Sequence, residues 1–337
     1  MSKRAAPAPS ASNPLDGEAA RFADDLTRAL GRVADTPVLL AVSGGPDSMA
    51  MLALAHAAIP DGIAVATVDH GLREDAAAEA KLVADWCAAH HVAHATLHPA
   101  APVAGASLQA RARTARYALL AEHARAIGAA CVATAHHVDD QAETFLMRAA
   151  RGSGLAGLAG VRARTIIAGA TIVRPLLDWR RAELRAIVRR LDMRFVDDPA
   201  NADPRHDRTR FRLLLGANEW LDPPNLARAA AALADVDADV RATVDWLWAS
   251  HAVVDGGAVR ISPADLPREL RRRLVRRAIA AVRDAAGIAS PAWSESANVE
   301  ALLDSLAAGR RATQAGVIAA PQGESWRFRP APPRRSH

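Results

Sequence analysis

Apolar and polar residues alternate in blocks along the first half of the chain. Helical patterns with mixed faces separate these blocks and cover residues 47–58, 75–90 and 107–127. Most positions within each apolar block are apolar, which is typical of strands buried on both faces of a sheet. Such strands are expected at 38–42, 63–68, 93–97 and 129–133. The alternation predicts an α/β fold in which a parallel sheet carries helices on both faces.

The composition and the hydrophobic pattern of the chain change after residue 216. From there it is dominated by helical segments rich in Ala, Arg and Leu, followed by a strand-like segment at 316–329. A chain of 337 residues is long enough for two domains. We therefore expect a disordered tail over 1–20, an α/β domain over 21–216 and a smaller, mainly helical domain over 217–332.

The first predicted strand leads into a glycine-rich turn that opens a helix. Backbone N–H groups and a helix N-terminus converge on one anion in such a turn, and glycines let the main chain approach it closely. The spacing is neither that of a Walker A loop nor that of a Rossmann fingerprint. An ordinary capped strand-to-helix turn is the alternative. The pattern favours a phosphate site built from Ser43, Gly44, Gly45, Pro46, Asp47 and Ser48.

Polar residues also follow the second predicted strand and occupy the third predicted helix. His70 and Arg73 stand where they could bind the adenine or ribose of a nucleotide, although a routine turn also explains them. Arg113 and Arg116 lie three residues apart on one helix face, where they could neutralise phosphate charge. A solvated basic face is the alternative for this pair.

Carboxylates and histidines cluster after the fourth predicted strand. His136, Asp139, Asp140 and Glu143 all fall within residues 136–143, and Asp139 and Glu143 are four apart on one helix face. The cluster indicates a metal-binding or amine-binding site. Acids at a helix N-terminus are the alternative, because the helix dipole favours them there. Mg²⁺ held together with phosphates is preferred over zinc, because adjacent histidines point in different directions.

Charge and composition narrow the functional class. The net charge of +5 and the pI near 10.1 favour a polyanionic partner. In the second domain, an arginine-rich helix with Arg271, Arg272 and Arg276 could bind phosphates, or its arginines could pair with Glu269 and nearby acids. Trp326 and Phe328 are interpreted as core residues rather than a stacking surface. Two cysteines, no long apolar run and no secretory signal indicate a reduced, cytoplasmic protein without membrane spans.

Taken in order, these motifs identify a family resemblance. Residues 43–48 resemble the Ser-Gly-Gly-x-Asp-Ser loop of the N-type ATP pyrophosphatases. Together with five further segments, this loop resembles the motifs of the bacterial tRNA(Ile)-lysidine synthases, which occur in the same order over about 36–212. The further segments are 69–73, 112–117, 135–144, 151–158 and 174–177. Ala200 and Thr209 depart from residues usual in the family, which leaves the role of that loop open.

The resemblance implies a ligase acting in two steps. ATP adenylates O2 of the wobble cytidine in a CAU-anticodon tRNA(Ile), and the ε-amine of free lysine then attacks C2 and expels AMP. It implies catalytic roles for Asp47, Arg113, Asp139, Asp140 and Glu143, and nucleotide binding by the 43–48 loop with His70, Arg73 and Arg116. It further implies lysine binding by Asp139, Glu143 and His136, and Mg²⁺ on Asp47 and Asp140. The tRNA would be bound by Arg208, Arg210, Arg271, Arg272 and Arg276, and the chain would form a homodimer.

Three other functional classes are weighed against this one. A tRNA thiolase of the same fold is disfavoured, because Cys87 and Cys131 are isolated and lie within predicted elements. An amidating synthetase acting on a small molecule would need an ammonia source, and no glutaminase segment is visible. A non-catalytic tRNA-binding protein would be expected to have lost its carboxylates or its loop, and both are intact.

Overall fold

The computed structural model describes residues 14–71, 76–102, 108–197, 205, 207–263, 265–294 and 296–332. Contacts divide the chain into two units, Met1–Ala234 and Asp235–His337. The division falls inside helix α9 (Pro223–His251), later than the predicted boundary near 216. The first turns of α9 belong to the first unit because they pack on it: Ala230 is buried beside Gly160.

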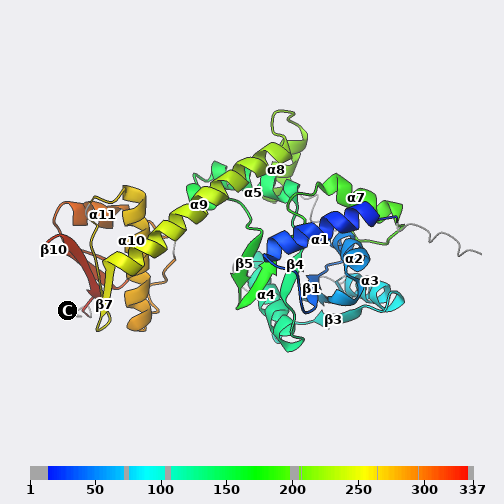
Figure 1. Ribbon diagram of the computed structural model, residues 1–337, viewed down its shortest axis with the longest axis horizontal. Coiled ribbons are helices and arrows are strands. Elements are labelled where there is room, and N and C mark those ends of the chain that lie inside the picture. Colours follow the sequence, from blue (N-terminus) through cyan, green and yellow to red (C-terminus); the bar gives the residue numbers. More distant parts are fainter. Residues whose placement is uncertain are drawn as a thin grey trace, which may run out of the picture. The chain divides into compact units, whose positions relative to one another are not determined.

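The first unit contains the predicted sheet (Figure 1). Its strand order is β3-β2-β1-β4-β6-β5, and all neighbours are parallel except β5 and β6. The four expected strands are confirmed to within two residues, while the hairpin formed by β5 and β6 extends the sheet at one edge. The strands are β1 (Val38–Ala41), β2 (Ile63–Val68), β3 (Ala93–Leu97), β4 (Cys131–Thr134), β5 (Arg164–Ile167) and β6 (Ala170–Val173).

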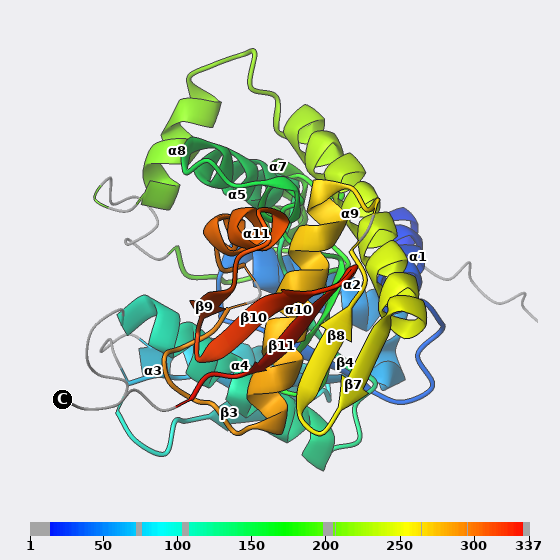
Figure 2. The same ribbon diagram turned by 90° about the vertical axis from the view of Figure 1, so that its left-hand side faces the viewer.

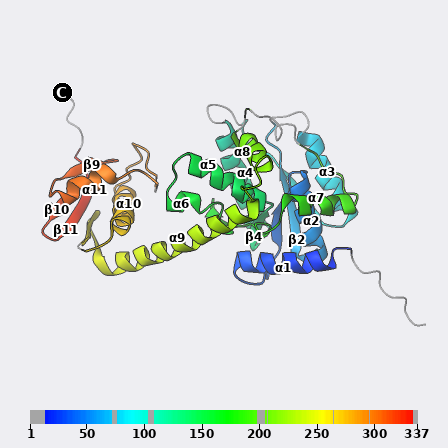
Figure 3. The same cartoon turned by 90° about the horizontal axis from the view of Figure 1, so that it is seen from above.

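Alternate residues of the central strands face two separate apolar cores. Leu40 packs with α1, α2, α3 and α7 on one face, whereas Leu39 packs with α4 on the other. Residues of α1, α2 and α7 share the first of these cores, and Figure 3 shows α1 running along one border of the first unit. The helices that surround the sheet are α1 (Asp16–Leu30), α2 (Pro46–Ala58), η1 (Pro60–Gly62), α3 (Ala76–Ala89), α4 (Leu108–Ala126), α5 (Val138–Ala150), α6 (Leu155–Leu158), α7 (Arg181–Arg190) and α8 (Asp207–Gly216).

Helix α1 corrects the predicted N-terminal tail. It begins at Asp16, inside the segment 1–20 that composition had indicated as disordered. Phe22 and Leu26 on this helix are buried in the first core, so the apolar face, rather than the alanine content, decides its structure. Residues 1–13 lie outside the described ranges.

The second unit combines helices with a sheet. Its three helical segments, which include the last part of α9, contain more residues than its strands. The strands form a five-stranded antiparallel sheet in the order β7-β8-β11-β10-β9. Of this sheet, only a strand at 316–329 was anticipated from the sequence. Figure 2 shows α10 crossing behind these strands. Trp326 and Phe328 are buried against α10, which confirms that they are core residues. The elements are β7 (Ala252–Asp255), β8 (Ala258–Ile261), α10 (Arg268–Ala285), α11 (Glu300–Ala307), β9 (Ala312–Gln314), β10 (Val317–Gln322) and β11 (Ser325–Pro330).

The topology places two of the predicted motifs side by side. Strand β1 pairs with β2 on one side and with β4 on the other, in parallel register. Loops that leave the carboxyl ends of β1 and β4 therefore meet at the point where the strand order reverses, the usual ligand site of such sheets. These loops begin at residues 42 and 135. Within the described ranges, no helix is both long and apolar enough to cross a membrane.

Candidate active site

The glycine-rich turn after β1 adopts the predicted strand–loop–helix form. Gly44 has φ +82°, a left-handed backbone conformation that favours glycine. Gly45 caps α2, and Pro46 is its first residue. The Ser48 hydroxyl donates to the Gly45 carbonyl at 2.9 Å. The loop is thereby held around the N-terminus of α2, which suits an anion.

A buried histidine joins the two motifs at the reversal point. Nε2 of His137 lies 3.4 Å from Oδ2 of Asp47 and 3.5 Å from Oδ2 of Asp140. Burial lowers the pKa of His137, but Asp140 and Asp47 outweigh burial and raise it overall. Oδ1 of Asp47 is buried and has no hydrogen-bond partner among the described residues. The structure thus brings Asp47 and Asp140 together and leaves one carboxylate oxygen of Asp47 unsatisfied.

His137 also begins the helix that carries the other carboxylates. Its Nδ1 accepts the backbone N–H of Asp140 at 3.3 Å, and Oδ2 of Asp140 accepts the backbone N–H of His137 at 3.1 Å. Burial raises the pKa of Asp140, but His137 and Arg208 outweigh it and hold this pKa at about 2. Asp140 is therefore ionised, and it serves as a helix cap as well as a candidate ligand.

Glu143 is the most heavily bonded carboxylate of the cluster. Its side chain is about 1% exposed and accepts hydrogen bonds from Arg208 at 2.6 Å, Arg212 at 2.8 Å and Arg181 at 2.9 Å. Burial raises its pKa, but Arg212 and Arg208 outweigh burial and lower it. These bonds fasten α7 and α8 to α5. Glu143 is thus a structural anchor in this structure, in addition to being a predicted lysine ligand.

Asp139 and His136 face different surroundings. Oδ2 of Asp139 accepts the backbone N–H of Arg181 at 2.8 Å, and Arg180 lies 3.5 Å away. Nδ1 of His136 lies 3.0 Å from the Thr134 hydroxyl. Burial, aided by nearby arginines, lowers the pKa of His136 to about 3, so its ring is neutral at pH 7 and a weak base.

Two of these arginine partners were not expected from the sequence. Arg181 and Arg212 were not among the residues singled out from the sequence, yet both bond Glu143. The available signal was electrostatic: three acids near one helix start require counter-cations, and the run Arg180-Arg181 offers them.

The arginines of α4 and the polar residues after β2 form the third part of the site. The guanidiniums of Arg113 and Arg116 lie 5.0 and 5.5 Å from the ring centroid of Tyr117. Burial, with a further contribution from Arg116, lowers the pKa of His70, and Nδ1 of His70 is buried without a hydrogen-bond partner among the described residues. Arg73 lies outside the described residues. His70 therefore has a free nitrogen for a ligand.

The predicted tRNA-binding arginines divide into two kinds. Arg208 bonds Asp140 and Glu143, and Arg272 bonds Glu269 and Glu300, so both have acidic partners. The alternative interpretation of α10, arginines paired with acids, thus describes Arg272. Three of the five remain without an acidic partner among the described residues: Arg210, Arg271 and Arg276, the last of which donates to the carbonyl of Ala297.

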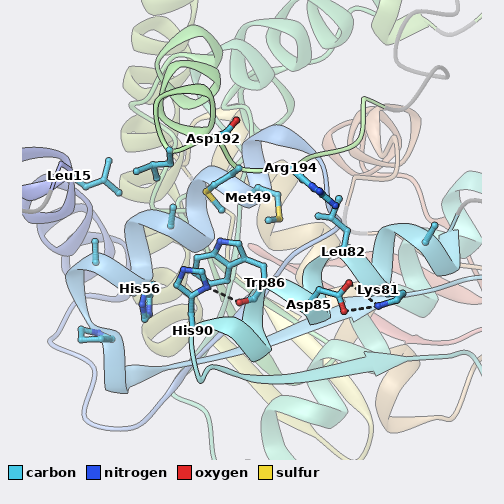
Figure 4. A pocket seen from close by; sticks show the side chains of 16 residues that line it. Leu15, Met49, His56, Lys81, Leu82, Asp85, Trp86, His90, Asp192 and Arg194 are labelled. Atoms are coloured by element: carbon cyan, nitrogen blue, oxygen red, sulfur yellow. Dashed lines mark hydrogen bonds and ion pairs between the residues drawn. The ribbon is translucent and has the colours of Figure 1, made fainter.

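A cavity lies elsewhere in the first unit. Its volume is about 890 Å³, and it opens between α2, α3 and the end of α7 (Figure 4). Trp86 stacks on His90 with centroids 3.8 Å apart, and Lys81 and Asp85 pair with each other on its rim. It lacks the carboxylate cluster and the phosphate loop, so the reversal point remains the candidate site.

The two cysteines are unsuited to sulfur transfer. Cys87 on α3 and Cys131 on β4 are both buried and free. Burial raises the pKa of Cys87 to about 12 and that of Cys131 to about 11, so both are thiols rather than thiolates at pH 7. This agrees with the argument against a thiolase.

Comparisons with known proteins give a consistent picture. A family model described as a PP-loop domain matches residues 18–218. A tRNA(Ile)-lysidine synthase of Novosphingobium aromaticivorans is 43% identical over 96% of both chains, and one of Zymomonas mobilis subsp. mobilis is 40% identical over 88% of this chain and 89% of the relative. Among solved structures, the U34-tRNA thiolase NcsA from Methanococcus maripaludis matches with a TM-score of 0.53 and 15% identity, covering 64% of this chain and 78% of that one, and it supports the fold alone.

Proposed function

Because the chain belongs to the tRNA(Ile)-lysidine synthases, a family with a PP-loop domain, we propose that it is an ATP-dependent carbon–nitrogen ligase. Its substrates are a CAU-anticodon tRNA(Ile), free lysine and ATP, and its products are lysidine-containing tRNA, AMP and pyrophosphate. One observation carries the proposal: His137 holds Asp47 of the phosphate loop next to Asp140 of the acidic helix. Nucleotide and amine sites thus adjoin.

In the first step, O2 of the wobble cytidine attacks the α-phosphorus of ATP, and pyrophosphate leaves. The cytidine oxygen becomes part of a phosphate ester, so the later leaving group is AMP. The N-terminus of α2 and the N–H groups after Gly44 bind the departing pyrophosphate, because unpaired backbone N–H groups at a helix start attract anions. Arg113 and Arg116 bind further phosphate charge, and His70 contacts the nucleoside through its free nitrogen.

In the second step, the neutral ε-amine of lysine attacks C2 of the adenylated base, the C2–O2 bond breaks, and AMP leaves with both electrons. Asp139, Asp140 and Glu143 attract the lysine ammonium groups and orient the amine. Asp140, with a pKa of about 2, and His136, with one of about 3, are too weak to take the amine proton at pH 7. Neither of these two groups is therefore the base that takes the proton.

The residues present fit a Mg²⁺ ion bound with the substrate. Mg²⁺ prefers one or two carboxylates combined with phosphate oxygens and water. Oδ1 of Asp47 is such a carboxylate oxygen, buried and unpartnered among the described residues, whereas both oxygens of Asp140 are already bonded. Asp47 is therefore the principal ligand and Asp140 an outer one. When bound, the ion neutralises charge on the triphosphate.

Further parts of the proposal concern partners and location. Arg210, Arg271 and Arg276 contact tRNA phosphates, supplying affinity without sequence reading. A homodimer is supported by the outer edge of β7, which pairs only with β8 in the described sheet and exposes Val253 and Val254. A reaction that uses tRNA, ATP and free lysine together takes place in the cytoplasm.

The decisive experiment measures pyrophosphate release and [³H]lysine incorporation with tRNA(Ile) transcript carrying the CAU anticodon. A methionine tRNA with the same anticodon is the matched control. We expect incorporation only into the isoleucine tRNA and only with ATP. Pyrophosphate release without lysine transfer would contradict lysine as the nucleophile. No turnover with either tRNA would contradict tRNA as the substrate.

A further inference from the structure

The connection between α8 and α9 carries a tryptophan that lies almost entirely in solvent. Trp220 is 87% exposed, the highest value among the large hydrophobic side chains of the described residues. Its backbone is nevertheless held: the N–H of Trp220 donates to Oδ1 of Asn218 at 3.0 Å, and Leu221 closes a turn on the Asn218 carbonyl. Figure 2 shows this connection as the loop that rises above α8. The indole therefore gains nothing from packing within the described part of the fold, which points to a role in binding.

This connection is fastened to the candidate site at both ends. Before it, Arg208 and Arg212 of α8 bond Glu143. After it, Asp222 lies 3.9 Å from Arg180, whose guanidinium is 3.5 Å from Asp139. Two residues of extended chain span at most about 7 Å, so the backbone of Trp220 stays within that distance of Asp222, whose side chain is linked to Asp139 through Arg180.

The surroundings of Trp220 suit an exposed nucleobase. Leu213 and Leu214 at the end of α8 are 61% and 45% exposed, and Arg210 is an exposed guanidinium without a partner among the residues that the structure describes. Single-stranded RNA is bound by aromatic rings that stack on unpaired bases, combined with nearby cations that meet the phosphates. Apolar, aromatic and cationic groups are gathered here in one short segment.

We propose that Trp220 stacks on the anticodon adenine that follows the wobble cytidine. The inference rests on the proposed function, since it assumes that the cytidine enters the site. A base taken into an active site leaves its neighbour without a stacking partner. The indole replaces that partner, since Trp220 stands two residues before Asp222, on the segment that Arg180 links to Asp139. Trp220 is thus a positioning residue, because it touches the adjacent base and holds the cytidine O2 in place.

The test uses tRNA(Ile) transcript with 2-aminopurine in place of the anticodon adenine. Stacking on an indole quenches 2-aminopurine fluorescence, so binding of the full-length protein should quench it. We expect Trp220→Ala to lose the quenching and Trp220→Phe to keep part of it. Trp246→Ala, which removes another exposed tryptophan (65%), is the matched control and should keep it all.

Kinetics on the unmodified transcript form the second arm. One stacked base contributes about five- to 150-fold in affinity, so Trp220→Ala should raise the KM for tRNA by about fivefold or more. The KM values for ATP and lysine should not change, which a general loss of structure would not produce. Equal quenching and equal tRNA KM in Trp220→Ala would overturn the stacking proposal. Absence of lysine incorporation by the wild-type protein would instead overturn the proposed function, so the two failures are distinguishable.

Discussion

Replacing Glu143 by Gln tests whether this carboxylate anchors α7 and α8 to α5. Removing one partner of a buried ion pair costs about 3–5 kcal/mol, because the opposite charge is left uncompensated. The side chains of Arg181, Arg208 and Arg212 are 21%, 43% and 30% exposed, so solvent screens part of that cost. We therefore expect about 2–4 kcal/mol of lost stability. In a unit of this size, that lowers the midpoint of thermal unfolding by about 4–16 °C.

The assay is thermal unfolding followed by circular dichroism, with Asp85→Asn as the control. Asp85 pairs with Lys81 on an exposed helix face, where the loss is about 0.5 kcal/mol at most. The pH dependence gives a second check. The pKa of Glu143 is lowered by folding, so its stabilisation is complete above the ordinary value of 4.5 and is lost as the pH falls through the folded pKa. The difference between wild type and Glu143→Gln should therefore shrink in acid. A midpoint shift no larger than that of Asp85→Asn would refute the anchor.

Three further predictions concern the metal ligand, the thiols and the second core. Asp47→Ala should reduce pyrophosphate release by about a hundredfold or more while changing the unfolding midpoint by about 2 °C at most; retained release would contradict the metal assignment. Cys87 and Cys131 should resist iodoacetamide at pH 8 in the folded protein and react only after unfolding, because thiols with pKa values of about 12 and 11 are almost wholly protonated there; mass spectrometry of the native protein checks this. Phe328→Ala should cost the second unit about 3–5 kcal/mol in urea unfolding, since this side chain is fully buried, and a loss below about 1 kcal/mol would contradict the assigned core.

The first sheet was predictable because its central strands are buried on both faces. Each core needs its own set of apolar residues, so Leu39 and Leu40 are both apolar and the strand appears as one continuous run. The β5–β6 hairpin was less visible, because β5 lies at an edge and exposes Arg164 and Ile166. In the second unit, β7, β8 and β9 have three or four residues each, too few to show a period.

The sequence predicted those site residues that lie within recognisable motifs. Asp47 and Asp140 were expected to share a function, and the strand order explains why they meet: β1 and β4 are neighbours although residues 42–130 separate them. The histidine that joins them was missed, because adjacent His136 and His137 are equivalent in sequence. Only the fold decides that His137 faces both carboxylates while His136 faces Thr134.

The balance of charge at the reversal point constrains how a nucleotide is accommodated. Glu143 and its neighbours on α5 are already matched by arginines from α7 and α8, so that part of the site has no surplus positive charge for a triphosphate. The positive charge that balances ATP therefore has to come from Arg113 and Arg116 on α4. A divalent cation at Oδ1 of Asp47, which is unpartnered among the described residues, would add to it. Under the proposed function, we expect the lysine ammonium to compete with Arg208 for Oδ1 of Asp140. We infer that an arginine displaced in this way becomes available to a phosphate or to the departing AMP, which would link amine binding to anion stabilisation.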